Sequence, residues 1–205
     1  PSGLTAISLL DLATHRSGLP NNPDNLCPQT WDGFGCFTPE RVYEFLNGHT
    51  LAQEPRATWL YSNVGFGLLG HALALKTGLS YEALLRERIL DPLALHDTRV
   101  TLSPAQQSRR ATGHWGLVPW GEFRMPAMEG AGALHSTAND LLTFLEHLSG
   151  LQTNVLGNIA TEALRRRASG GNANEAMARG WMLFAAPGGE LIWHDGSTWG
   201  QNAFI

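Results

Sequence analysis

The spacing of apolar residues changes once along this chain of 205 residues, and that change limits the folds that it can adopt. From Ser62 to Lys76 apolar residues recur at three- and four-residue spacing, which is typical of a helix. From Trp181 onward they alternate instead, and a Pro187-Gly188-Gly189 turn between two apolar runs indicates a β-hairpin. The sequence therefore predicts an α+β fold, helical over about residues 1–170 and with antiparallel strands over about 180–205.

Turn formers and helix caps set the bounds of the other expected elements. Further helices are expected over 4–15, 38–48, 80–90, 103–109, 137–148 and 159–168, and a third strand over 201–205. Between residues 20 and 39, where Pro, Asn, Asp and Gly are frequent, a long surface loop is expected.

Three glycines, Gly65, Gly67 and Gly70, lie inside the helix expected over 62–76. Each glycine in a helix interior costs about 0.5–1 kcal/mol of stability. We therefore expect another backbone to pack closely against this helix, because such packing offsets that cost.

Composition and charge exclude several classes of protein. Hydrophobic residues make up 43% and charged residues 16% of the chain, which is typical of a folded globular domain. The formal net charge is −4 and Arg165-Arg166-Arg167 is the only basic run, so no nucleic-acid partner is expected. No stretch reaches the about 18–20 apolar residues that a membrane-spanning helix needs.

No metal site and no cofactor are expected from the sequence. The histidines show no paired metal-ligand spacing, and all except His194 are interpreted as surface or hydrogen-bonded structural residues. Two cysteines, Cys27 and Cys36, cannot complete a tetrahedral zinc site by themselves. Their spacing is compatible with a local disulfide and equally with two free thiols, and it does not decide between them.

Two short motifs carry the candidate chemistry. Tyr61-Ser62-Asn63 directly precedes a helical run, and alone it indicates only a helix cap. His194-Asp195-Gly196-Ser197 alone indicates only a hairpin turn, because Asp-Gly is a strong turn signal. Two longer sequence segments are also present, Asp11–Leu19 (DLATHRSGL) and Gly130–Thr137 (GAGALHST). The second is followed by Asp140–Leu145 (DLLTFL).

Taken together, these segments resemble the recurring motifs of the serine β-lactamase and penicillin-binding-protein superfamily, in the same order and over essentially the whole chain. That family includes class C β-lactamases, D-alanyl-D-alanine carboxypeptidases and related esterases. The resemblance implies a β-lactamase/transpeptidase-like fold and a serine hydrolase that acts through a covalent acyl-enzyme. It also implies peptidoglycan-peptide, β-lactam or small ester substrates, and a periplasmic or extracellular location.

The resemblance further assigns roles to individual residues. Tyr61 matches the tyrosine of the Tyr-x-Asn motif, which acts as general base and later protonates the leaving group. Asn63 matches the asparagine that holds the acyl-side amide of the substrate. His194 stands where the family has Lys-Thr-Gly or His-x-Gly, and would steer the substrate carboxylate with a pH-dependent charge. Gly196 would let the acyl group lie against the strand, and the Ser197 N–H would be one oxyanion-hole donor.

One element of the family's site is missing from this sequence. No serine has a lysine three positions later, so there is no Ser-x-x-Lys nucleophile. Lys76-Thr77-Gly78 has the same residues as the family's third motif, Lys-Thr-Gly. Because it lies at the end of an expected helix, it is interpreted as a helix C-terminus. The nucleophile is expected upstream of Pro1 in a chain cut at both ends, which predicts that these residues alone are inactive. The alternative is a non-catalytic binding or regulatory relative that has lost the nucleophile.

Overall fold

The computed structural model describes residues 7–30, 33–152 and 156–205, and these form helices and antiparallel strands, as predicted. The helices are α1 (Leu9–Ala13), α2 (Pro39–Gly48), α3 (Asn63–Thr77), α4 (Tyr81–Leu85), the π-helix η2 (Arg86–Leu90), α5 (Pro104–Gln107), the 3-10 helix η3 (Glu129–Ala131), α6 (Ala138–Leu148) and α7 (Asn158–Leu164). The strands are β1 (His114–Trp115), β2 (Val118–Pro119), β3 (Ala168–Ser169), β4 (Glu175–Met177), β5 (Met182–Ala186), β6 (Gly189–Trp193), β7 (Asp195–Thr198) and β8 (Gln201–Phe204). Residues 4–6 of the first predicted helix lie outside the described residues. No helix in the described part of the chain has the length and apolarity to cross a membrane.

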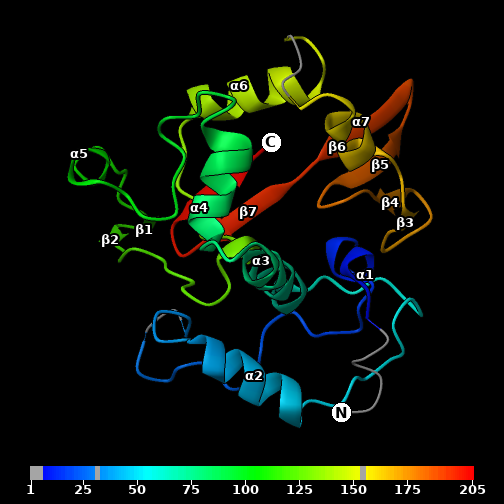
Figure 1. Ribbon diagram of the computed structural model, residues 1–205, viewed down its shortest axis with the longest axis horizontal. Coiled ribbons are helices and arrows are strands. Elements are labelled where there is room, and N and C mark those ends of the chain that lie inside the picture. Colours follow the sequence, from blue (N-terminus) through cyan, green and yellow to red (C-terminus); the bar gives the residue numbers. More distant parts are fainter. Residues whose placement is uncertain (1–6, 31–32, 153–155) are drawn as a thin grey trace.

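Helix α3 lies in the middle of the molecule and fixes the residues around Tyr61 (Figure 1). Ser62 caps it, because its side-chain oxygen accepts a hydrogen bond from the Gly65 N–H at 2.9 Å. The helix ends at Thr77, and Gly78 follows in the left-handed conformation with φ 72°. Lys76-Thr77-Gly78 is therefore a helix C-terminus, as predicted, and lies on no strand.

The glycines of α3 allow a second backbone to approach, which confirms the packing expected from them. A Cβ added at Gly67 would lie 2.8 Å from the Cβ of Met128 and 3.1 Å from its Cα. A Cβ added at Gly70 would lie 3.2 Å from the Cα of Gly130 in η3. The segment around η3 thus lies directly on α3, at a distance that a larger side chain does not allow.

Replacing Gly67 by alanine is expected to destabilise the protein by up to about 2 kcal/mol. Alanine improves helix propensity by ~1 kcal/mol, but its methyl group would overlap Met128, and overpacking costs about 1–3 kcal/mol. Urea unfolding measures the net effect. Gly48→Ala is the matched control, since no atom in the described part of the chain lies within 4 Å of that Cβ position. A Gly67→Ala protein as stable as the Gly48→Ala protein would contradict the close packing.

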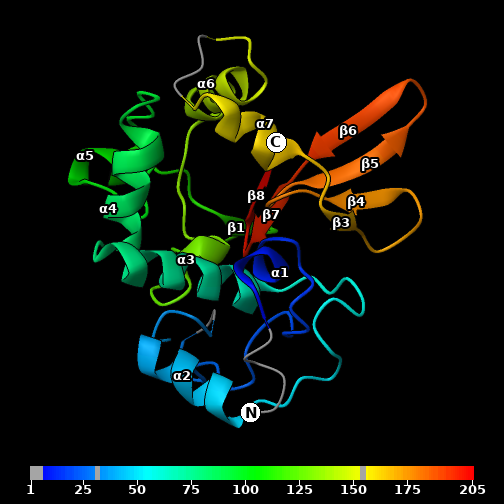
Figure 2. The ribbon, with the colours of Figure 1, turned by 45° about the vertical axis from the view of Figure 1, so that its right-hand side comes forward.

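The strands form a sheet of order β3-β4-β5-β6, and β7 pairs with β8. Strand β6 leads through His194 into β7, so the chain runs extended from one pairing into the other. Backbone hydrogen bonds of 3.0 Å in both directions between His194 and Ile205 extend the β7–β8 pairing. Figure 2 shows β7 and β8 running from the β5–β6 hairpin toward α3.

The sheet begins earlier than the sequence predicted. Helix α7 ends at Leu164 and not near residue 168, and residues before the strands expected from about 180 onward already form β3 and β4. A turn joins these strands, in which the Gly170 N–H donates to the Glu175 carbonyl at 2.9 Å and the Gly171 N–H donates to the Glu175 carboxylate at 3.1 Å. Such short strands carry no alternating apolar pattern, so the prediction for this segment was wrong.

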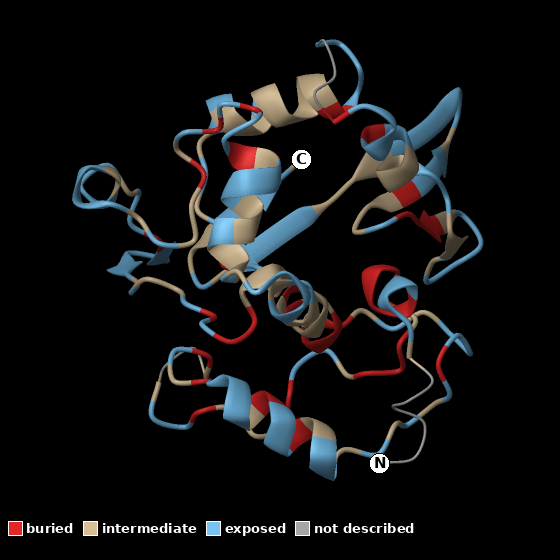
Figure 3. Cartoon of the chain, viewed as in Figure 1, coloured by how far each residue is buried: buried red, intermediate tan, exposed pale blue. Residues whose placement is uncertain are grey.

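The segment over 20–39 is a loop with many exposed residues, as its composition predicts, but some of its apolar residues are buried. Cys27 and Phe37 in this segment are 1% exposed, and they join Val64 of α3 in the main hydrophobic cluster. Figure 3 shows buried chain between α2 and α3. The turn formers set the path of this segment, while the apolar residues between them supply part of the core.

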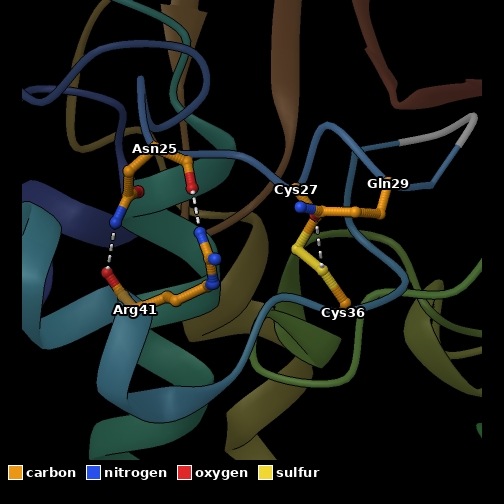
Figure 4. Close-up of a disulfide and its surroundings, with 5 residues drawn as sticks. All are labelled: Asn25, Cys27, Gln29, Cys36 and Arg41. Atoms are coloured by element: carbon orange, nitrogen blue, oxygen red, sulfur yellow. Dashed lines mark hydrogen bonds between the residues drawn. A yellow bond between two sulfur atoms is a disulfide. The ribbon is translucent and has the colours of Figure 1, made fainter.

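A disulfide joins Cys27 to Cys36, with 5.9 Å between their Cα atoms (Figure 4). Nearby, the Asn25 amide donates to the Arg41 carbonyl at 2.9 Å, and the Arg41 guanidinium donates to the Asn25 carbonyl at 3.0 Å. These bonds tie the disulfide loop to α2. Of the two alternatives that the cysteine spacing left open, the structure has the disulfide.

Reduction of this disulfide is expected to lower the free energy of unfolding by about 2–3 kcal/mol. A short crosslinked loop removes conformational entropy from the unfolded chain, and the loss of that restraint favours unfolding. Urea unfolding with and without dithiothreitol measures the effect. The double variant Cys27→Ser, Cys36→Ser should show no response to dithiothreitol. A wild-type protein that is equally stable in the reductant would contradict the prediction.

Candidate active site

A cleft of about 1060 Å³ opens beside the start of α3. The residues singled out in the sequence all line it, namely Tyr61, Asn63, His194, Gly196 and Ser197. Tyr61 directly precedes the N-cap of α3 and Asn63 begins that helix, while the other three belong to the extended chain that leads from β6 into β7. The fold therefore brings the two sequence motifs into one site.

Tyr61 lies beside two histidines. Its ring stacks on the His15 ring with 4.2 Å between centroids, and the His194 ring lies 6.4 Å away. Burial raises the pKa of the Tyr61 phenol above its ordinary value, and the negative charge of Asp195 raises it further. In this environment the phenol keeps its proton at neutral pH.

Asn63 is the first residue of α3 and is held by the preceding loop. Its backbone N–H donates to the Asn21 carbonyl at 2.9 Å. Its side-chain nitrogen donates to the Asn22 side-chain oxygen at 2.9 Å. Because the amide nitrogen is engaged in this way, the side-chain oxygen is the part of Asn63 that can accept a bond from a ligand N–H.

The backbone N–H of Ser197 in β7 points away from the partner strand β8. Hydrogen-bonded and non-bonded residue pairs alternate along an antiparallel ladder. His194 and Ile205 exchange both backbone bonds, so Gly196 and Ala203 form the next bonded pair. Ser197 therefore belongs to a non-bonded pair, and its N–H points to the edge of β7 opposite β8.

That edge of β7 borders the cleft. Strand β5 pairs with β6 no further than Trp193, and β7 pairs with β8 alone among the strands of the described residues. Ser197 itself is exposed and lines the cleft. Its N–H is thus available to a molecule that lies along this edge.

Sequence reasoning missed three residues that shape the site. Buried His15 contacts Tyr61, Asn22 holds Asn63, and the charge of Asp195 acts on the Tyr61 phenol. His15 and Asp195 lie within segments that the motifs had marked, so a signal existed for both. Asn22 lies among turn-forming residues in the sequence, and such a composition does not indicate a contact with Asn63.

The site can supply a phenol, a carboxamide, an imidazole and a backbone N–H to a bound molecule. The described residues contain no group of three or more His, Cys, Asp or Glu side chains placed to hold a metal ion. The available groups are those of proton transfer and of hydrogen bonding to an amide or an oxyanion.

A sequence model of the family described as Beta-lactamase matches residues 1–205. The chain belongs to the beta-lactamase family. A similar curated protein, the D-alanyl-D-alanine-carboxypeptidase/endopeptidase AmpH of Escherichia coli (strain K12), is 33% identical over 142 residues, which cover 69% of this chain and 36% of the relative. A penicillin-binding protein of Bacillus subtilis (strain 168) is 24% identical over 220 residues, which cover 97% of this chain and 48% of the relative.

Solved structures show the beta-lactamase fold for this chain, as the motifs predicted. A class C beta-lactamase superposes with a TM-score of 0.81 at 20% identity, over 97% of this chain and 60% of that one. A beta-lactamase/D-alanine carboxypeptidase from Yersinia pestis, complexed with citrate, gives 0.78 at 24% identity, over 94% and 57%. The beta-lactamase family chain described here thus spans less than half the length of these two curated relatives and about three fifths of these solved chains.

Proposed function

We propose that this chain forms part of a serine hydrolase that transfers an acyl group to an enzyme serine and then to water. The observation that carries the proposal is the meeting of Tyr61, Asn63 and the outward N–H of Ser197 in one cleft. The phenol of Tyr61 is suited to proton transfer, and the carboxamide of Asn63 to amide recognition. The Ser197 N–H, which points away from β8, is suited to oxyanion stabilisation.

In this proposal the acyl group of the substrate lies along β7. Among the described residues no atom lies within 4 Å of the position that a Cβ on Gly196 would take, so the strand surface is open there. The Ser197 N–H donates to the developing oxyanion, a contact worth about 2.7–4 kcal/mol in the transition state. Asn63 accepts a hydrogen bond from the substrate amide through its side-chain oxygen, and His194 steers the substrate carboxylate.

Tyr61 is the proposed proton carrier, and it needs a cation beside it to lose its proton near neutral pH. Its pKa is raised by burial and by Asp195, which both oppose ionisation. Lys76 is the only lysine in the sequence, and it lies about 20 Å along α3 from Asn63, at ~1.5 Å per residue. We therefore assign the activating lysine and the nucleophilic serine to a Ser-x-x-Lys segment outside these 205 residues.

The proposed substrates are peptides ending in D-Ala-D-Ala, β-lactams and small esters. The names of the relatives support a peptide or β-lactam substrate, since they include a carboxypeptidase and a penicillin-binding protein. The proposed location is the periplasm or the cell exterior. The Cys27–Cys36 disulfide supports this location, because disulfides form and persist in oxidising compartments.

Covalent capture tests the proposal. The natural gene product that contains these residues and the 205-residue chain are each incubated with benzylpenicillin and measured by intact-protein mass spectrometry. The proposal expects a penicilloyl adduct on the longer protein, on a serine that has a lysine three positions later, and no adduct on the shorter chain. An adduct on the shorter chain would overturn the assignment of the nucleophile.

The alternative is a non-catalytic binding relative, which the absence of a Ser-x-x-Lys motif favours. It expects reversible binding of an acetylated Lys-D-Ala-D-Ala peptide to the longer protein, measurable by calorimetry. It also expects neither an adduct nor release of D-alanine. Release of D-alanine by the longer protein would exclude it.

A further inference from the structure

His15 holds Tyr61 through three separate contacts. Its carbonyl oxygen accepts the N–H of Leu60 at 2.8 Å. Its side-chain Nδ1 accepts the N–H of Ser62 at 3.0 Å. Its ring stacks on the Tyr61 ring at 4.2 Å, with 29° between the planes. One residue therefore fixes the backbone on both sides of Tyr61 and the face of its ring.

His15 is itself firmly held. It is 1% exposed, and the rings of Phe66 and Trp59 lie 4.7 Å and 6.1 Å from its own. Its backbone has φ 55°, a left-handed conformation that residues other than glycine rarely adopt. Such a conformation persists only where the surroundings determine it. The position of the imidazole is therefore set before any ligand enters the cleft.

A residue that only filled this space would not need to be polar. Because Nδ1 accepts a hydrogen bond, the ring is neutral and carries its proton on Nε2. That Nε2 is buried and has no hydrogen-bond partner among the described residues, which is unfavourable. The bond to Ser62 and the aromatic contacts offset this cost, and both act on the residues next to the cleft.

We propose that His15 is a positioning residue for Tyr61, which fixes the phenol relative to Asn63 and β7. His15 does not belong to the described residues that line the cleft, so it acts through Tyr61 and not on a substrate. The inference rests on the proposed function only where it treats Tyr61 as the proton carrier.

Two substitutions separate the contacts of His15. Asn at position 15 retains a side-chain acceptor for the Ser62 N–H and tolerates positive φ, but it removes the stacked ring. Leu at this position removes both the acceptor and the ring. The chain has three tyrosines, so Tyr43 and Tyr81 are internal references for Tyr61 in the same protein.

Nuclear magnetic resonance of the chain with carbon-13-labelled tyrosine rings tests the inference. In His15→Asn the ring-flip rate of Tyr61 is expected to rise about tenfold, because the loss of one stacked aromatic contact lowers the barrier to rotation. The flip rates of Tyr43 and Tyr81 should not change. Hydrogen exchange at the Ser62 N–H stays slow in His15→Asn and becomes fast in His15→Leu. Unchanged Tyr61 flipping in His15→Asn would overturn the proposal.

If a variant fails to fold, the ring signals of all three tyrosines move to the chemical shifts of an unfolded chain, which identifies it. Phe66→Leu then serves as the second test, since it removes the ring on His15 and leaves the Ser62 bond in place. It is expected to speed the Tyr61 flip as well. Unchanged Tyr61 flipping in Phe66→Leu would likewise overturn the proposal.

Turnover by the longer protein separates this inference from the proposed function. If Tyr61 carries the proton, His15→Asn lowers kcat and leaves KM nearly unchanged. A faster ring flip with unchanged kcat would overturn the catalytic role of Tyr61 and leave its positioning by His15 standing. An unchanged ring flip overturns the positioning role whatever the activity.

Discussion

Acidification from pH 6.5 to about pH 4 is expected to lower the free energy of unfolding by about 3 kcal/mol through His15. Burial, together with a smaller effect of the nearby His194, lowers the pKa of His15 from 6.5 to about 4. In the unfolded chain the imidazole keeps its ordinary pKa. A shift of one pKa unit corresponds to ~1.4 kcal/mol. The pKa difference of about 2.5 between the unfolded and the folded state therefore corresponds to about 3 kcal/mol of stability.

The sign follows from proton uptake. Between pH 4 and 6.5 the unfolded chain binds a proton at His15 that the folded protein does not, so a falling pH favours unfolding. The contribution of His15 is complete above pH 6.5 and lost near pH 4. Burial also lowers the pKa of His135, which acts in the same direction, whereas burial raises the pKa of Glu129, which acts in the opposite one.

Urea unfolding of wild type and His15→Asn across this pH range isolates the effect, because the other groups cancel in the difference. Wild type should lose about 3 kcal/mol more than the variant. His96→Asn, at an exposed histidine, is the control and should keep the wild-type pH dependence. An equally steep loss of stability in His15→Asn would contradict the expectation.

Local signals were sufficient for α3, but at Asp195-Gly196 they indicated a hairpin turn where the structure has strand β7. The cap at Ser62 and the glycine at position 78 bound α3 as predicted, and its interior glycines indicated the approach of η3. The same signals did not reveal β3 and β4, because strands this short lack a period. Composition correctly predicted a loop over 20–39, but it did not show that apolar residues of this loop join α3 in the core.

The site was predictable in part. The order of the motifs was enough to expect Tyr61, Asn63 and His194 in one place, and the cleft contains all three. Their catalytic roles stay predictions. The contact between His15 and Ser62 could not be predicted, because it depends on a left-handed backbone and on burial, which no spacing in the sequence shows.

Replacing Tyr61 by phenylalanine in the natural gene product is expected to slow turnover by about 10²–10⁴-fold. This is the usual contribution of a positioned general acid or base. The phenyl ring can keep its stack on His15, so only the hydroxyl is removed and the fold should remain. Steady-state kinetics with nitrocefin, together with assays of D-alanine release, measure kcat and KM separately.

Tyr43→Phe is the matched control, because it removes the same atom from an exposed tyrosine whose hydroxyl pairs with His71 outside the cleft. Turnover by this variant should equal that of wild type. Whether Tyr61→Phe changes kcat or KM then decides between two roles of the hydroxyl. A loss in kcat with KM unchanged means that the hydroxyl acts in the transition state, whereas a rise in KM alone means that it only binds substrate. The second outcome would contradict proton transfer by Tyr61 and would require another base for acylation.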